Sequence, residues 1–207
     1  MRDAQLAPLA MGRPALDLMW TGGLTRMRSY YERFDSAQGL AGWLAEAVLD
    51  GEVVAVDQRV LQAARDLREA VFDIIRARTV GSRVDPQRFA TVNRVAAEPP
   101  LIPRVDPATA RRSWVAPVTA VAALSTIARD AIDLLTGPDA DRVRECANPD
   151  CELVFVDTSP PGQRRWCAMR RCGNIAKTRA YRRRARPARN SAVEPTSGAS
   201  DGDSTAK

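Results

Sequence analysis

Apolar residues recur at spacings of three and four in several parts of this chain, and each such part carries helix-start and helix-stop signals. That period places the apolar side chains on one face of an α-helix. In the most regular part, Asp57 is placed to cap the start and Gly81 follows the end. The apolar positions between these two residues are Val60, Leu61, Ala64, Leu67, Val71, Ile74 and Ile75.

Three shorter segments carry the same signals. Ser36 can cap a helix that Gly51 closes. Asp85-Pro86 is a typical N-cap and N1 pair for the next helix, and the doublet Gly137-Pro138 ends a last helix. The residues expected on the three buried faces are, in order, Leu40, Trp43, Leu44, Ala47 and Val48; Phe89, Val92 and Val95; and Val118, Val121, Leu124, Ile127, Ala131 and Leu135.

The remaining segments suggest a small amount of β structure. Ala15–Trp20 fits either a strand or a helical turn, and residues 109–116 fit a short strand or hairpin arm. We therefore expect a mainly α N-terminal domain with a small β element over residues 1–137. A separate unit follows over residues 141–186. Small polar residues without a periodic apolar face predict a disordered tail over residues 187–207.

The net charge of +6 is concentrated in that second unit. Residues 1–140 hold 17 basic and 17 acidic side chains, whereas residues 141–190 hold 13 basic and 5 acidic ones. Residues 164–189 contain 11 Lys or Arg and no acid. Such a block is typical of a surface that binds a polyanion, although a solubilising tail has the same composition.

All four cysteines of the chain lie in the second unit. Cys146 and Cys151 are separated by four residues, as are Cys167 and Cys172, and 15 residues lie between the two pairs. Two close pairs with such a spacer are typical of a structural zinc site, in which the spacer folds back as a hairpin. The turn expected for that hairpin is Ser159-Pro160-Pro161-Gly162. Four unrelated buried cysteines and an iron–sulfur cluster are the alternatives.

The chain has no histidine, so a catalytic zinc of the usual type would lack its commonest ligand. Trp166 and Phe155 are expected to form a small core over the metal rather than a platform for bases. Arginines next to the cysteines either offset the charge of a four-thiolate zinc or contact a partner. A helix is predicted after Cys172, up to Pro187. The candidate nucleic-acid contacts are Arg164, Arg165, Arg170, Arg171, Lys177, Arg179, Arg182, Arg183, Arg184 and Arg186.

These residues resemble the CGNR zinc-finger family. The resemblance rests on Cys-Ala-Asn-Pro-Asp-Cys from Cys146, on Phe155–Ser159, on Arg164–Met169 and on Cys172-Gly173-Asn174, about 40 residues in all. Ile175 stands where the arginine that names the family is expected.

Residues 10–135 are similar to the ABATE domain that usually precedes this finger, with Met19-Trp20 where the family commonly has Asn. The landmarks shared with that domain include Leu67-Arg68-Glu69-Ala70-Val71. The resemblance implies a bacterial, stress-linked transcriptional regulator that binds DNA through its finger.

We therefore predict a regulator that binds double-stranded DNA through one structural Zn²⁺ and the basic helix, with the N-terminal domain sensing a ligand or a partner. An RNA- or ribosome-associated binder and a thiol-based redox or metal sensor are the competing hypotheses. Asp3, Pro8 and Pro14 break any secretory h-region, and no stretch is apolar enough to span a bilayer, so a cytoplasmic protein is expected. No motif nominates an enzyme, and the sequence leaves the oligomeric state open. We also expect the finger to unfold independently of the helical domain when a cysteine is replaced.

Overall fold

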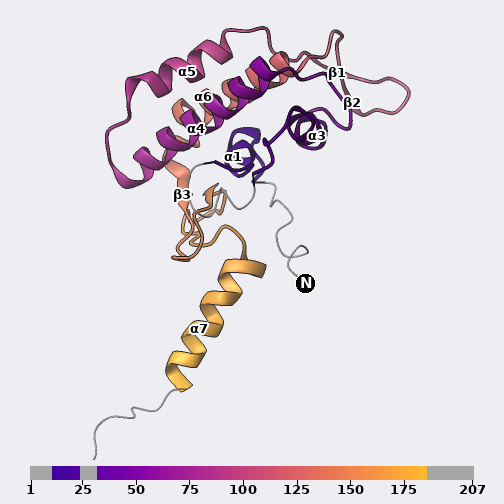
Figure 1. The fold of residues 1–207 in the computed structure, drawn as a ribbon. Coiled ribbons are helices and arrows are strands. Elements are labelled where there is room, and N and C mark those ends of the chain that lie inside the picture. The colour runs from indigo at the N-terminus through magenta and orange to yellow at the C-terminus, as the bar shows by residue number, and fades with distance from the viewer. Residues whose placement is uncertain (1–10, 24–31, 186–207) are drawn as a thin grey trace, which may run out of the picture.

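The computed structural model describes residues 11–23 and 32–185, and its ribbon is drawn in Figure 1. The first part of the chain is helical, as predicted, and Ala15–Trp20 proves to be largely a helix. The elements of this part are α1 (Pro14–Met19), α3 (Ala37–Ala47), α4 (Gln58–Val80), α5 (Pro86–Ala96), β1 (Pro103–Val105), β2 (Arg112–Trp114) and α6 (Ala120–Thr136).

Side-chain caps fix where α3, α4, α5 and α6 begin. The Ser36 hydroxyl accepts a hydrogen bond from the Gly39 N–H at 3.1 Å, and Asp57 accepts one from the Val60 N–H at 2.8 Å. Asp85 caps α5 in the same way, through the Gln87 N–H at 2.9 Å. Each cap satisfies a backbone donor that the first turn leaves without a partner. The starts predicted from sequence are therefore confirmed.

The long helix α4 packs against α1, α3, α5 and α6 to form the main hydrophobic core. Most predicted inward positions are buried, but Phe89 is 44% exposed and Val121 is 40% exposed. The buried stripe of α6 is rotated toward Ala120 and Leu134, which leaves Val121 on the edge of the helix. Phe89 lies in the first turn of α5, before the residues that contact the core.

A buried ionic group lies inside this helical domain. Arg68 is 3% exposed and forms two hydrogen bonds with Glu32, at 2.7 and 3.0 Å, and a third with Glu69 at 3.1 Å. Its guanidinium lies over the Phe34 ring, 5.2 Å from the centroid. Removing the acidic partners of such a buried cation would leave its charge uncompensated and would destabilise the fold.

The second part of the chain contains η1 (Ala140–Arg142), β3 (Val143–Glu145), β4 (Val154–Val156), η2 (Met169–Gly173) and α7 (Asn174–Ala185). The antiparallel pair β3–β4 brackets the first cysteine pair, with Val143 opposite Val156 and Glu145 opposite Val154. The prediction of a hairpin built around Ser159–Gly162 was therefore wrong. A turn does form there, since the Gly162 N–H donates to the Ser159 carbonyl at 3.0 Å, but β4 precedes it and no described strand follows it to pair across the turn.

The β3–β4 hairpin joins two cores. Val143, Val154 and Val156 belong to the core of the helical domain, whereas Phe155 belongs to the core around the cysteines. Successive side chains of a strand point to opposite faces, so β4 contributes to both cores at once. Arg76 and Thr79 of α4 also contact Glu145, at 2.6 and 2.9 Å. The finger was expected to unfold independently of the helical domain. Because one hairpin contributes to both cores, the structure argues against that expectation.

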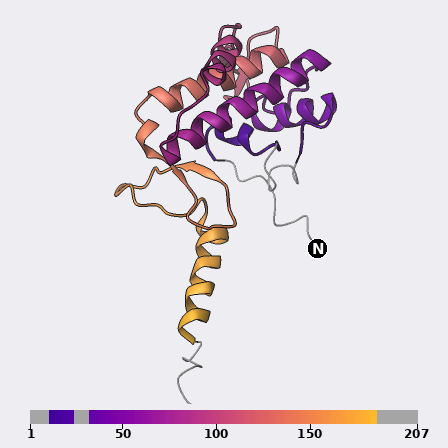
Figure 2. The same ribbon diagram turned by 60° about the vertical axis from the view of Figure 1, so that its left-hand side comes forward.

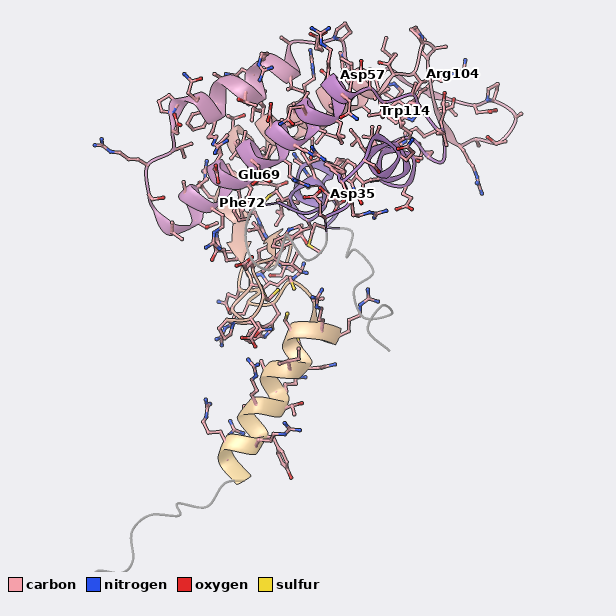
Figure 3. The ribbon with its side chains drawn as sticks, in the orientation of Figure 1. Asp35, Asp57, Glu69, Phe72, Arg104 and Trp114 are labelled. Atoms are coloured by element: carbon pink, nitrogen blue, oxygen red, sulfur yellow. The ribbon has the colours of Figure 1, made fainter. Side chains whose placement is uncertain are left out.

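Helix α7 projects away from the rest of the protein in both ribbon views (Figures 1 and 2). Figure 3 shows its side chains standing out from the helix on several sides, many of them tipped with nitrogen. Among the described residues, no helix is long and apolar enough to cross a membrane. The predicted tail, 187–207, lies outside the described residues.

Candidate metal centre and basic helix

The first cysteine pair lies on the loop between β3 and β4. The Cys146 N–H donates to the Leu153 carbonyl at 2.8 Å, which extends the ladder by one bond. The Cys151 N–H donates to the Asn148 carbonyl at 2.8 Å, closing the turn expected from Asn148-Pro149-Asp150. Proline and Asx residues favour such a tight turn, and the turn brings the two thiols to the same side of the loop.

The second pair lies where the chain enters α7. Cys172 belongs to η2, a π-helical turn, and the Gly173 N–H donates to the Ala168 carbonyl at 3.2 Å. A Cβ added to Gly173 would lie 2.6 Å from the Met169 sulfur, so a larger residue here would displace the end of the Met169 side chain. Cys167 precedes this turn in an extended segment, and the fold thus carries both sulfurs back toward the first pair.

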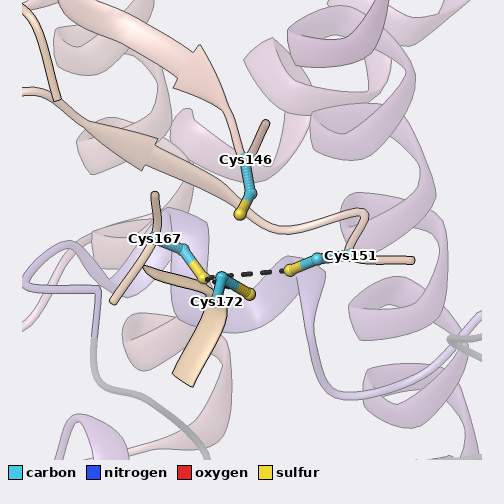
Figure 4. A group of neighbouring side chains, drawn as sticks. All are labelled: Cys146, Cys151, Cys167 and Cys172. Atoms are coloured by element: carbon cyan, nitrogen blue, oxygen red, sulfur yellow. Dashed lines mark hydrogen bonds between the residues drawn. The ribbon is translucent and has the colours of Figure 1, made fainter. Parts of the chain in front are cut away.

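The four Sγ atoms lie within 4.8 Å of one another (Figure 4). The Cys151–Cys167 sulfur distance is 3.8 Å and the Cys167–Cys172 distance is 3.7 Å. A tetrahedral Zn²⁺ with Zn–S bonds of about 2.3 Å separates its sulfurs by about 3.8 Å. A disulfide needs about 2.05 Å, and all four cysteines are free. The sulfurs enclose room for one ion rather than a cluster of several irons, so the site is a single structural zinc site.

The environment of these thiols requires a cation before they can ionise together. Burial raises the pKa of Cys146, and the hydrogen bond with Cys167 followed by burial raises the pKa of Cys151. Four thiolates so close together repel one another, and a bound Zn²⁺ offsets that repulsion. With four sulfur ligands the coordination is complete, and no position remains for a reacting water.

Asn148 connects the metal centre to α7. Its side chain is 6% exposed, and its Nδ2 donates to the Cys172 sulfur at 3.5 Å. Its Oδ1 accepts a hydrogen bond from Arg179 at 3.3 Å, and Arg179 also pairs with Asp150 at 2.5 Å. Arg179 therefore fixes the direction of α7 relative to the zinc-binding loop, and its guanidinium is already engaged within the protein.

Arg164 is likewise engaged within the protein. Its guanidinium lies over the Phe155 ring, 4.6 Å from the centroid, and donates to the carbonyls of Trp166 and Cys167. Its backbone N–H donates to the buried carboxylate of Asp157 at 2.9 Å. Hydrogen bonds from Ser159 first, and then from the Arg164 N–H, lower the pKa of Asp157. These contacts hold the spacer against the finger core.

The small core over the metal is the one expected from sequence. Phe155 is 1% exposed, and Trp166 packs against the same group as the cysteines. Met11 and Trp20 also contact this group and the helical core. The Trp20 side chain thereby gives the finger a second apolar connection to the helical domain.

The ten basic candidates divide into two groups. Arg164 and Arg179 serve the finger itself. Arg165 lies over the Trp166 ring at 5.3 Å and has no acidic partner among the described residues. The structure likewise gives no ion pair to six others that it describes, and Arg186 lies outside the described residues. These six are Arg170, Arg171, Lys177, Arg182, Arg183 and Arg184.

The roles of two residues in the finger were not predicted from the sequence. Asn148 was recognised only as turn chemistry, and nothing in the spacing indicated its bond to sulfur. Asp157 carried a signal that could have been used, because an Asp two residues before a Ser often closes a local turn through its carboxylate.

Fold and site together define a helical domain that carries a closed four-cysteine zinc finger. Residues 12–138 match the ABATE family, described as "Putative stress-induced transcription regulator", and residues 142–185 match the CGNR zinc finger. The chain belongs to the ABATE family, and its C-terminal part is a CGNR zinc finger. A search of curated proteins finds none that matches it.

Proposed function

We propose that this protein is a DNA-binding transcriptional regulator whose contact surface is α7 and the adjoining face of the zinc finger. The observation that carries the proposal is the projection of α7 from the body (Figure 2), together with cations along it that have no ion pair among the described residues. Its 12 residues are about 18 Å long, and an α-helix fits the major groove of DNA. Arginine is suited to phosphate and guanine edges because its donors form a rigid fork.

The metal centre supports a binding role rather than catalysis or redox sensing. The four sulfurs fill the coordination sphere, so we propose that the protein is not an enzyme. Three of the ligands, Cys146, Cys167 and Cys172, are at most 7% exposed, which gives an oxidant little access to the site. Free thiols also suit a reducing compartment, so we place its action in the cytoplasm.

We further propose that the helical domain senses a ligand or a partner and passes its state to α7. An open groove of about 490 Å³ lies between α4, α5 and α6. Apolar side chains such as Val60, Val95 and Leu124 line it together with charged residues of both signs, namely Asp57, Arg59, Arg94 and Glu98. Helix α4 lines this groove near its start and contacts β3 near its end. A shift of α4 would therefore reach the hairpin that carries the zinc.

The test is the salt dependence of duplex DNA binding by the zinc-loaded full chain, measured by fluorescence anisotropy. If about six cations meet phosphates, log K falls against log salt with a slope of about −5. Replacing Arg182, Arg183 and Arg184 with Gln should reduce the slope by about 2.7. A matched triple variant of the exposed Arg83, Arg104 and Arg111, which lie outside that groove, should leave it unchanged.

A flat salt response of the wild type, or an equal loss in both triple variants, contradicts the proposal. Competition with a structured RNA at fixed salt separates DNA binding from the RNA alternative. A stronger preference for RNA would replace the DNA proposal with an RNA-binding one. Selection of bound sequences from a random duplex library then gives the target.

A further inference from the structure

A groove of about 390 Å³ lies between α7 and the zinc-binding loop. Its apolar floor is made by Pro149 of the loop, the Trp166 indole, and Ala176 and Ala180, which are four residues apart on one face of α7. Alanine at these two helical positions leaves the groove open, because any longer side chain would fill it.

The walls of the groove carry arginines and no acid. Arg165 stands on the loop side and Arg183 on the α7 side, and neither has an acidic partner among the described residues. Arg179 also lines the groove, but its guanidinium is held by Asn148 and Asp150. It therefore sets the width between the two walls and leaves the other two arginines to a ligand.

We propose that this groove holds the sugar–phosphate backbone of one DNA strand, an inference that rests on the proposed function. The apolar face of the deoxyribose lies on the floor, and successive phosphates meet Arg165 and Arg183. Charge complementarity selects the occupant, because two unpaired cations flank an apolar channel that no carboxylate lines. The groove thus grips one strand while the free side of α7 lies in the major groove beside it.

The same floor favours DNA over RNA. A ribose 2′-hydroxyl placed on Pro149 and Ala180 loses its water and finds no hydrogen-bond partner on those side chains. Asn148, the amide that lines the groove, has its Nδ2 on Cys172 and its Oδ1 on Arg179. We expect a preference of roughly tenfold for a DNA strand in this position.

The deciding variant is Ala180→Leu, which fills the groove without changing the charge and keeps a good helix former. It should weaken duplex binding roughly ten- to thirtyfold and reduce the salt slope by about 1.8, as though two cations had been removed. Ala90→Leu makes the same change at an exposed position of α5 and should alter neither value. Zinc content and helical circular dichroism establish that each variant is folded.

The outcomes separate this proposal from the proposed function. If the wild type binds DNA with a steep slope but Ala180→Leu behaves like Ala90→Leu, the groove proposal fails alone. If the wild type shows no salt-dependent binding, the proposed function fails with it. Should Ala180→Leu lose zinc, Arg165→Gln replaces it as the test, with an expected slope reduction of about 0.9. An unchanged slope in that variant, or tighter binding of RNA than of DNA, also overturns the proposal.

Discussion

Removing zinc should destabilise the helical domain as well as the finger. The finger core is small, and without the metal it has too little apolar surface to stay folded. Its hairpin is nevertheless part of the larger core, where Val143, Val154 and Val156 are 7%, 0% and 6% exposed. Loss of the metal releases the far side of the hairpin, and the three valines then lose the strand pairing that holds them in place.

The size of the effect follows from those three side chains. Burying a valine stabilises a protein by roughly 1.5 kcal/mol, so the three contribute about 4.5 kcal/mol as an upper estimate. The ion pairs Arg76–Glu145 and Arg78–Asp141 are substantially exposed and add little. A domain of this size loses about 3–4 °C of Tm per kcal/mol, so the helical transition should fall by at most roughly 13–18 °C.

The measurement is thermal unfolding followed by circular dichroism at a helical wavelength, with zinc bound and after chelation under reducing conditions. Cys151→Ser should reproduce the chelated state. Val154→Ala should cost about 2 kcal/mol with zinc bound and should reduce the penalty of chelation by a similar amount. Val105→Ala removes the same methyl groups from a side chain that is 72% exposed, and is the control. An unchanged helical transition after complete zinc loss would refute the shared core.

Two further predictions concern single side chains. Ile175 is 41% exposed in the first turn of α7, and Ile175→Arg should steepen the salt slope of DNA binding by about 0.9, whereas Ile175→Ala should not. Burial alone would raise the pKa of Glu32, but hydrogen bonds from Arg68 and from backbone N–H groups lower it below its ordinary value of 4.5. A carboxyl whose folded-state pKa is lowered contributes stability that is fully present above its unfolded-state pKa. This contribution is lost as the pH falls through the folded-state pKa. Urea denaturation should therefore show that Glu32→Gln costs about 3 kcal/mol at pH 7 and removes part of the loss of stability on acidification; equal acid sensitivity in both proteins would contradict this.

Local signals were sufficient for the helices and for the zinc ligands. Ser36, Asp57 and Asp85 cap helices within a few residues of themselves, so their role does not depend on the rest of the fold. The four cysteines are similar, because their short spacings already place each pair on one turn. The metal site was thus predictable down to its ligands.

Contacts between distant segments were not available from the sequence. The turn residues Ser159–Gly162 suggested a hairpin, but the pairing that forms joins β3 to β4 around the first cysteine pair. The sequence of a short, fully apolar strand such as Val154–Val156 does not indicate which of its faces packs against which core. The direction in which Trp20 packs depends on both cores being present, and no local rule provides that information.

The arginines show why a count of charges overstates a binding surface. The basic block was read as one surface, yet Arg164 lies over Phe155 and Arg179 holds the zinc-binding loop. These two cations lie close to the thiolates, where they stabilise the finger with or without DNA. Replacing either should therefore disturb the metal site, whereas replacing Arg183, which has no partner in the described chain, should affect only binding. The division between structural and binding arginines thus depends on which guanidinium groups already have partners, and only the folded chain shows that.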